Sequence, residues 1–487
     1  MQHLEELQPA EIWKYFNEIL AIPRVSKKEE QIITYLEQFA ADHHLQHSRD
    51  QAGNLLITKQ ASPGMENRKG AVLQSHVDMV GETQAGVSHD FDRDPIRAFI
   101  TDGWVHARGT TLGADDGIGI AASMAILASD KITHGPLECL FTVDEESGMT
   151  GALGLQPGFI SGSILLNLDS EDDGEIFIGC AGGIDTVAHF RFQKKRVNRN
   201  KPALRVKVNG LQGGHSGDEI HKGFGNAIKI LNRFLWNADQ RFRIGLAGIT
   251  GGKARNAIPR EAEAVITLPA KSLELIKVYF ESFVQILREE LKDVEPDFRM
   301  SLEPVESPDF VMSRRQQKKL FRTLYACPHG VIAMSRQIRD LVETSTNLAS
   351  IRVLSDDVLE IVTSQRSSVE SAKQDIADRM SALFKLLGAS VKHSDGYPGW
   401  KPDLSSELLK IAESAYRDLF NRQPEIKAIH AGLECGLFLQ KYPQLDMISV
   451  GPTIRGAHTP EERLNIETVE KFWVFLLRVL EELPAEE

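Results

Sequence analysis

Acidic and imidazole side chains follow several apolar runs of this 487-residue chain, at the points where the runs end. The run LFTV, which begins at Leu140, is followed by three successive acids, Asp144, Glu145 and Glu146. A solvated loop is the ordinary explanation of such a triplet. Other positions of the same kind are occupied by His76, Asp78, Asp115, Asp116, Asp169 and His458. The carboxyl ends of strands in an open α/β sheet form its ligand-binding edge, so these side chains are expected to meet there.

Each of these positions alone has an ordinary structural explanation. A single histidine after a strand usually makes a structural hydrogen bond, and Asp115-Asp116 before a helix has the position of an N-cap. Gathered at one edge, however, several carboxylates and two imidazoles would repel one another or stay unpaired without a cation. Histidine and carboxylate ligands without thiolates suit zinc, manganese or cobalt better than calcium. The number of ligands exceeds one tetrahedral site, so we expect two divalent metal ions about 3.5–4 Å apart that share one carboxylate.

The elements that must position these residues are short apolar runs that alternate with helical stretches. The runs lie at 54–59, 71–78, 137–146 and 164–169, and residues 114–128 have the composition of a buried helix. Such alternation is typical of an α/β sheet. A helix is predicted to begin near Pro9 and another at Ser26, where Glu29 completes the spacing of a capping box.

The texture of the sequence changes near residue 185, where apolar and basic residues begin to alternate as in strands with one solvated face. Two blocks of strands and helices follow, the second with a helix opened by a capping box at Ser367 and closed at Gly388. The α/β texture returns after the Pro- and Gly-rich stretch 394–403 and ends in a helix over 466–482. We therefore predict a discontinuous α/β domain (1–186 and 394–487) that carries an inserted α+β domain (187–393).

The composition of the chain argues against some classes of binding partner. The formal net charge of −12 argues against nucleic acid or an anionic membrane as the main partner. No stretch approaches the roughly 20 apolar residues of a membrane span, and the N-terminus lacks the pattern of a signal peptide. The four cysteines are far apart and form no CxxC pair, as expected of reduced thiols in a cytoplasmic protein.

The motifs SHVDMV, GADDGIG, DEESGMTG, NLDSED and GAHTPEE occur in this order along the chain. Together they resemble the motifs of the M20 family of co-catalytic metallopeptidases, and within it the aminoacyl-histidine dipeptidase branch. The resemblance covers essentially the whole chain, including the inserted domain. It implies a zinc-peptidase-like domain with a mixed sheet flanked by helices, an inserted lid and dimerisation domain, and a homodimer.

The resemblance also implies a ligand set for the two metal ions, most simply Zn²⁺, with Mn²⁺ or Co²⁺ as alternatives. One ion would be held by His76, Asp115 and Asp169, and the other by Asp115, Glu146 and His458. Asp115 would be the bridging ligand, because the family places its bridging aspartate first in this loop.

Further roles follow from the same resemblance. Asp78 would orient His76 from behind, and Glu145 would be the general base that takes a proton from the attacking water. Both glutamates of the triplet can reach one site only where the strand is breaking up, since successive strand residues point to opposite faces. Asp116 is expected to tune the charge of the site or to cap a helix, and Asp144 to have a capping or a solvated role.

Candidate substrate-binding residues lie mostly in the inserted domain. His215 occupies a glycine-rich turn, and the resemblance implies that it stabilises the oxyanion from the lid, within one subunit or across a dimer. Asn256 is a candidate for the substrate carbonyl or the oxyanion. Arg366 could clamp a terminal carboxylate or form a surface ion pair, and Glu434 could meet an α-ammonium.

The function expected is hydrolysis of dipeptides with free termini, with Xaa-His (carnosine-like) substrates implied by the branch resemblance. An aminotripeptidase or an N-acyl amino acid deacylase would use the same metals on a different substrate. A non-catalytic peptide-binding protein on the same scaffold is a rival from another class. A di-metal phosphoesterase is disfavoured, because the glycine-rich stretch GGKARNAIPRE lacks the spacing of a phosphate loop.

Overall fold

The computed structural model describes residues 3–198, 200–355 and 357–486, and the chain divides into two compact units. Unit 1 comprises Met1–Gly179, Trp400–Ala428 and Leu433–Glu487, and unit 2 comprises Cys180–Gly399 and Ile429–Gly432. The boundaries predicted from the sequence lie at 186/187 and 393/394. The first boundary falls earlier because strand β9 (Gly182–Arg191) pairs with a strand of unit 2 from its first residue.

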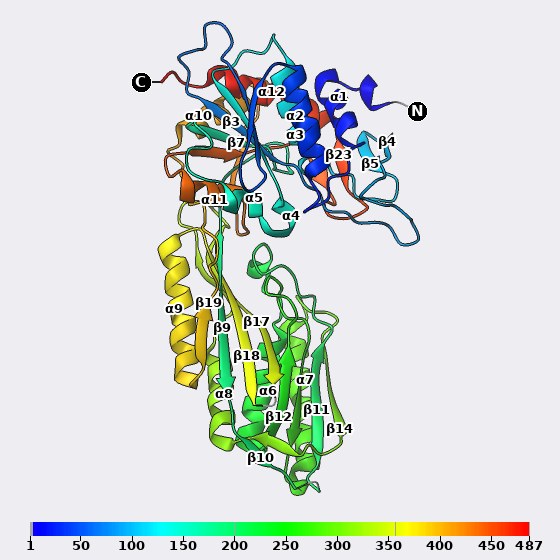
Figure 1. Ribbon diagram of the computed structural model, residues 1–487. Helices are drawn as coiled ribbons and strands as arrows, with labels where there is room; N and C mark the ends of the chain where they lie inside the picture. The colour runs from blue at the N-terminus through cyan, green and yellow to red at the C-terminus, as the bar shows by residue number, and fades with distance from the viewer. Residues whose placement is uncertain (1–2, 199, 356, 487) are drawn as a thin grey trace. The chain divides into compact units, whose positions relative to one another are not determined.

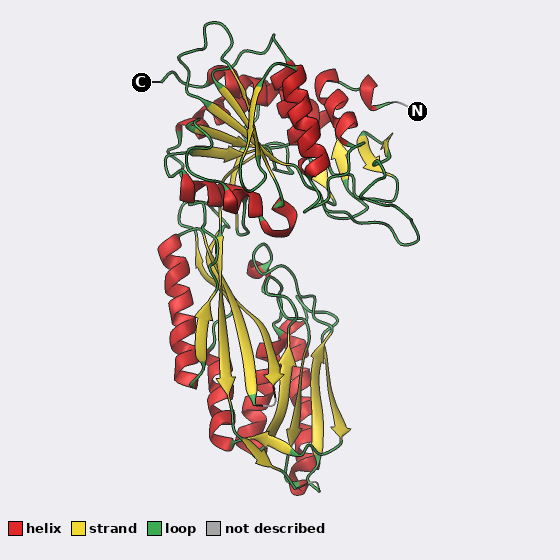
Figure 2. Cartoon of the chain, viewed as in Figure 1, coloured by secondary structure: helices red, strands yellow, loops and turns green. Residues whose placement is uncertain are grey.

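Unit 1 is built on a mixed eight-stranded sheet (Figures 1 and 2). Its central strands are parallel: β3 pairs with β6 and β7, and β7 pairs with β21. The strands in spatial order are β1 (Gln46–Arg49), β2 (Leu55–Lys59), β6 (Leu137–Thr142), β3 (Ala71–His76), β7 (Ile164–Asn167), β21 (Asp446–Ser449), β8 (Glu175–Cys180) and β20 (Glu425–Ile429). The parallel strands β3 and β7 are buried along their whole length, as expected of strands covered on both faces.

Helices pack against this sheet, with α3 on β3 and α10 on β21. The helices of unit 1 are α1 (Ala10–Ile19), α2 (Glu30–Asp42), α3 (Ala114–Ala128), α4 (Glu145–Gly148), α5 (Thr150–Gly154), α10 (Glu407–Phe420), α11 (Glu434–Lys441) and α12 (Ile466–Glu482), with the 3₁₀ turn η1 (Leu4–Glu6). A smaller sheet contains β22 (Ile454–Arg455), β23 (Arg463–Asn465), β5 (Trp104–Ala107) and β4 (Ala98–Thr101) in that order. The α/β fold class is confirmed, and helices α3 and α12 have the predicted bounds.

Unit 2 has a long antiparallel sheet with one layer of helices (Figure 2). Its strands in spatial order are β14 (Arg299–Val305), β11 (Ala203–Asn209), β13 (Ala262–Thr267), β12 (Gly245–Gly251), β17 (Val342–Ser355), β18 (Val358–Ser367), β9 and β19 (Ser390–His393), and β16 (Gly330–Met334) also pairs with β17. Neighbouring helices contact one another in the order α7 (Leu273–Leu291), α6 (Ala227–Phe242), α8 (Arg314–Ala326) and α9 (Glu370–Leu387). Short elements are β10 (Lys194–Arg196), β15 (Phe310–Met312), η2 (Ile220–Lys222) and η3 (Ala270–Ser272). This arrangement is the α+β type predicted for the inserted region.

Two predicted helix starts are wrong. Helix α2 begins at Glu30, and the hydroxyl of Ser26 donates instead to Oδ2 of Asp78 at 2.8 Å. Helix α9 begins at Glu370, and Ser367 is the last residue of β18. The predicted end of α9 is confirmed, since Gly388 closes the helix with a φ of +95°, a conformation that favours glycine.

Membrane-spanning segments were also sought among the helices. In the part of the chain that the structure describes, none of them combines the length and the apolar character needed to cross a bilayer.

Candidate metal centre

The central strands of unit 1 deliver the predicted residues to one edge of the sheet. Because β3, β6 and β7 are parallel, the residues that follow them lie at the same edge. His76 is the last residue of β3, Glu145 and Glu146 come three and four residues after β6, and Asp169 comes two residues after β7. Asp115 lies near the start of α3, where the backbone is not yet helical.

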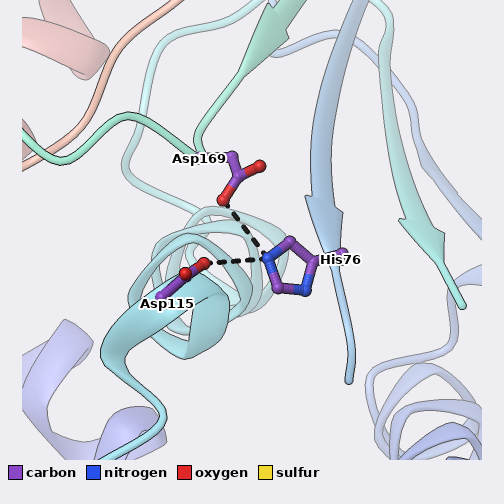
Figure 3. A group of neighbouring side chains, drawn as sticks. All are labelled: His76, Asp115 and Asp169. Carbon is purple, nitrogen blue, oxygen red and sulfur yellow. Dashed lines mark hydrogen bonds and ion pairs between the residues drawn. The ribbon is translucent and has the colours of Figure 1, made fainter. Parts of the chain in front are cut away.

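The first group of side chains converges on the His76 ring (Figure 3). Nε2 of His76 lies 2.9 Å from Oδ1 of Asp115 and 3.2 Å from Oδ1 of Asp169. The imidazole is 1% exposed, whereas Asp115 and Asp169 keep a small exposed fraction. These atoms are close enough together for all three side chains to ligate one ion.

The second group uses the other oxygen of Asp115. Nε2 of His458 lies 3.2 Å from Oδ2 of Asp115 and 2.9 Å from Oε2 of Glu146. Oε1 of Glu146 is buried and has no hydrogen-bond partner. Asp115 therefore directs one carboxylate oxygen to each histidine, which is the arrangement that a ligand shared between two ions requires.

The charges of this cluster favour a cation. Burial alone would lower the pKa of His76, but Asp169 and Asp115 outweigh burial and raise that pKa well above its ordinary value. Hydrogen bonds to Asp115 and Glu146 raise the pKa of His458 to about 11. Burial raises the pKa of Asp169 well above its ordinary value. Divalent cations would replace the protons that the cluster otherwise needs, so the donor set and the unpartnered Glu146 oxygen fit a pair of metal ions.

Asp78 supports both His76 and the turn that carries the two glutamates. Its Oδ1 lies 3.4 Å from Nδ1 of His76 and accepts the amide of Glu145 at 3.0 Å, and its Oδ2 accepts the amide of Glu146 at 3.1 Å. Burial would raise the pKa of Asp78, but His76, the Glu145 amide and the Ser26 hydroxyl hold that pKa at about 2. The strand has ended by this point, so Glu145 and Glu146 can both face the cluster, as predicted.

Glu145, which is half-buried, and the buried Glu434 are neighbouring acids. Burial raises the pKa of Glu145 to about 8, and repulsion from Glu434 and Glu146 contributes. Oε2 of Glu434 accepts hydrogen bonds from Gln74 at 2.7 Å and Thr142 at 2.8 Å. Oε1 of Glu434 is buried without a partner. Oε1 of Glu434 can therefore accept a hydrogen bond from a further donor.

Two acids of the predicted region have structural partners. Oδ1 of Asp116 accepts the amide of Gly119 at 3.1 Å, which caps the helical part of α3. Asp144 accepts the hydroxyls of Ser147 and Thr150, the latter at 2.6 Å, and braces the short helix α4. Both carboxylates are buried, so neither is a solvated surface charge.

The predicted residues of unit 2 form a separate polar group. Nε2 of His215 lies 3.4 Å from Nη2 of Arg366, and Nη1 of Arg366 donates to the hydroxyl of Tyr397 at 2.8 Å. Nδ1 of His215 lies 2.9 Å from Oδ2 of Asp218. Arg366 is 7% exposed and its Nε is unpartnered, so a simple surface ion pair is excluded for it. His215 and the exposed Asn256 line the same cavity of about 570 Å³.

Sequence reasoning missed several groups that hold the site in place. They are Arg24, Glu462, Gln74, Thr142, Asp218 and Tyr397. Most of them have no motif-like spacing, and only Glu462 lies inside a quoted motif, four residues after His458.

Fold and site together define a chain with a candidate divalent-cation site at the edge of an α/β sheet. Residues 72–482 match the model of peptidase family M20/M25/M40, and the chain belongs to this family. It is similar to the cytosol non-specific dipeptidase of Escherichia coli (strain K12), with 42% identity over 485 residues that cover 100% of both chains.

Solved structures also resemble this chain. The crystal structure of aminoacylhistidine dipeptidase from Vibrio alginolyticus matches with a TM-score of 0.93 and 42% identity, over 100% of this chain and 99% of that chain. A tripeptidase from Staphylococcus aureus matches with a TM-score of 0.56 and 16% identity, over 98% of this chain and 99% of that one. The second likeness concerns the fold alone.

Proposed function

We propose that this protein is a dipeptidase that depends on two divalent metal ions, with zinc as the first candidate and manganese or cobalt as alternatives. Its substrates are dipeptides with free termini, including Xaa-His dipeptides. The observation that carries the proposal is the pair of histidine–carboxylate groups that share Asp115. The similarity to two dipeptidases over the full chain supports the same reaction.

His76, Asp115 and Asp169 would hold one ion, and Asp115, Glu146 and His458 the other. Bound ions of this kind polarise the substrate carbonyl and lower the pKa of water toward neutrality. Glu145 accepts the proton of the attacking water and returns it to the leaving amine. Asp78 keeps the His76 ring in orientation, because its carboxylate faces Nδ1 of that ring.

The two ends of a dipeptide match two groups that keep unused hydrogen-bonding atoms. The free oxygen of Glu434 suits an α-ammonium, and the buried guanidinium of Arg366 suits an α-carboxylate. His215 and Asn256 would stabilise the oxyanion or bind the substrate carbonyl. A recognition site for a free ammonium favours a dipeptidase over an N-acyl amino acid deacylase, whose substrates lack that charge.

Further parts of the proposal rest on the family resemblance. Residues 1–186 with 394–487 would form the catalytic domain, and residues 187–393 the lid, which also makes a homodimer. The similarity to the cytosol non-specific dipeptidase of Escherichia coli supports a cytoplasmic location.

The test combines metal analysis with a matched substrate panel. The purified protein should hold two divalent ions per chain and cleave Leu-Gly and β-Ala-His. N-acetyl-histidine and Leu-Gly-Gly should be poor substrates. Preferred cleavage of the acylated amino acid or of the tripeptide would replace the dipeptidase proposal with a deacylase or an aminotripeptidase. Absence of bound metal together with peptide binding would indicate a non-catalytic protein.

A further inference from the structure

A buried carboxylate holds the backbone that carries Asp115. Oε2 of Glu462 accepts the amides of Leu112 at 2.7 Å and Gly113 at 2.9 Å, and Oε1 accepts those of Ala114 at 2.7 Å and Asp115 at 3.3 Å. Glu462 is 2% exposed. Four successive amides therefore share one carboxylate, and each of its oxygens serves two of them.

A buried guanidinium binds the same segment through a backbone carbonyl group. Nη2 of Arg24 donates to the carbonyl of Gly113, and Nη1 donates to the carbonyls of Val77 at 2.9 Å and Asp78 at 2.7 Å. Arg24 is also 2% exposed. This one side chain thus ties the segment before Asp115 to the segment that follows His76.

The packing around Gly113 shows how tightly this contact is fitted. Gly113 has a φ of +72°, and a Cβ there would lie 2.8 Å from both Nη2 of Arg24 and Sδ of Met79. A side chain at this position would displace the guanidinium. The residue that allows the left-handed turn also allows Arg24 to approach.

The position of Glu462 links two candidate ligands. It lies four residues after His458 in the turn between β22 and β23, where its amide donates to the carbonyl of Thr459 at 3.0 Å. One turn therefore presents an imidazole to Oδ2 of Asp115 and a carboxylate to the backbone of the same residue. A shift of this turn would move both groups together.

We propose that Glu462 and Arg24 are positioning residues that set the Asp115 carboxylate between His76 and His458 before any metal ion binds. Glu462 fixes the amides of residues 112–115 and Arg24 fixes the facing carbonyl, so the backbone under the shared ligand does not have to reorganise on binding. This proposal rests on the proposed role of Asp115 as the shared ligand. Supporting groups of this kind commonly change metal affinity or activity by about 10–100-fold when they are replaced.

The first test uses the unmodified full-length chain, stripped of metal with a chelator and then titrated with zinc alone. Hydrogen exchange should show the amides of residues 112–115 protected in the stripped protein, with little gain when zinc is added. Free exchange in the stripped protein, followed by protection only with zinc, would overturn the proposal. This arm requires no variant to fold.

The second test replaces Glu462 by glutamine, which keeps the shape but removes the charge and sets an N–H group against backbone amides. Zinc affinity of Glu462→Gln, measured by chelator competition, should fall about 10–100-fold for both ions. The neighbouring exposed Glu461→Gln should stay within about twofold of wild type as the matched control. Lower thermal stability of Glu462→Gln with unchanged zinc affinity would contradict the proposal, because a purely structural role predicts that pattern.

Glu462→Asp serves as the second variant if Glu462→Gln does not fold. Its carboxylate is one methylene shorter and keeps the charge, so we expect a zinc affinity between those of the wild type and Glu462→Gln. Wild-type affinity in Glu462→Asp would contradict the proposal. Failure of the metal centre itself would show separately, as an unmodified protein that binds no zinc.

Discussion

Two pairs of histidines, one pair in each unit of the molecule, lie in opposite electrostatic environments. In unit 1, His76 and His458 face carboxylates, which raise the pKa of each imidazole above its ordinary value. In unit 2, burial lowers the pKa of His430 to about 3 and that of His329 to about 4, and nearby Arg366 and Lys229 act in the same direction. His76 and His458 thus lie beside an excess of negative charge, whereas the environments of His430 and His329 favour a neutral ring.

This difference separates ligand histidines from structural ones. Nε2 of His430 lies 2.7 Å from the Ser345 hydroxyl, a hydrogen bond that a neutral ring can satisfy. The rings of His76 and His458 face several acids that cannot all be ionised without a cation. The surplus of negative charge, more than the presence of histidine, marks the metal centre.

The largest effect is expected for Glu145, the acid that faces the candidate metal centre but belongs to neither of the two proposed ligand groups. Glu145→Ala should keep both metal ions and lose about 10²–10⁴-fold in kcat, because the change removes the proposed acceptor of the proton of water. Metal analysis and steady-state kinetics of the same preparation check this, with Glu461→Ala as an exposed control. A wild-type kcat would rule out Glu145 as the base.

A smaller effect is expected in unit 2. His215→Ala should lower kcat about 10²–10³-fold with a lesser change in KM, as expected when a donor to the oxyanion is removed. The exposed His221 in the same loop provides the matched variant, and His221→Ala should behave as wild type. A rise in KM with kcat preserved would make His215 a group that binds the ground state.

The smallest effect concerns the stability of unit 2. Since burial lowers the pKa of His430 to about 3, the unfolded chain binds a proton below about pH 6.5 that the folded chain does not. The stability contributed by the neutral ring is therefore complete above pH 6.5 and is lost as the pH falls toward 3. Between pH 7 and pH 5 the wild type should lose about 2 kcal/mol relative to His430→Gln. Denaturant unfolding at the two pH values measures this gap, and an unchanged gap would show that the folded ring binds a proton as readily as the unfolded one.

The candidate site could be predicted from the sequence where its residues come at or just after the ends of apolar strands. Candidate ligands such as His76 and Asp169 lie at or just after the ends of apolar strands, so parallel pairing brings them together and their convergence could be predicted. The split of roles between Glu145 and Glu146 came only from the family resemblance, because spacing alone does not distinguish neighbouring acids.

Groups that act on backbone atoms were not predictable. Glu462 accepts amides about 350 positions away, and a carboxylate of this kind looks like any other acid in a turn. Ser26 shows the converse error: its spacing to Glu29 fits a capping box, but the Asp78 carboxylate, brought close by the fold, takes the hydroxyl instead. Local patterns fail where a distant partner offers a stronger hydrogen bond.

Anomalous diffraction from crystals grown with zinc tests the paired centre most directly. Two zinc peaks are expected about 3.5–4 Å apart, one beside His76 and one beside His458, with the Asp115 carboxylate between them. A single peak, or two peaks that do not share Asp115, would contradict the shared-ligand centre on which the proposed chemistry depends.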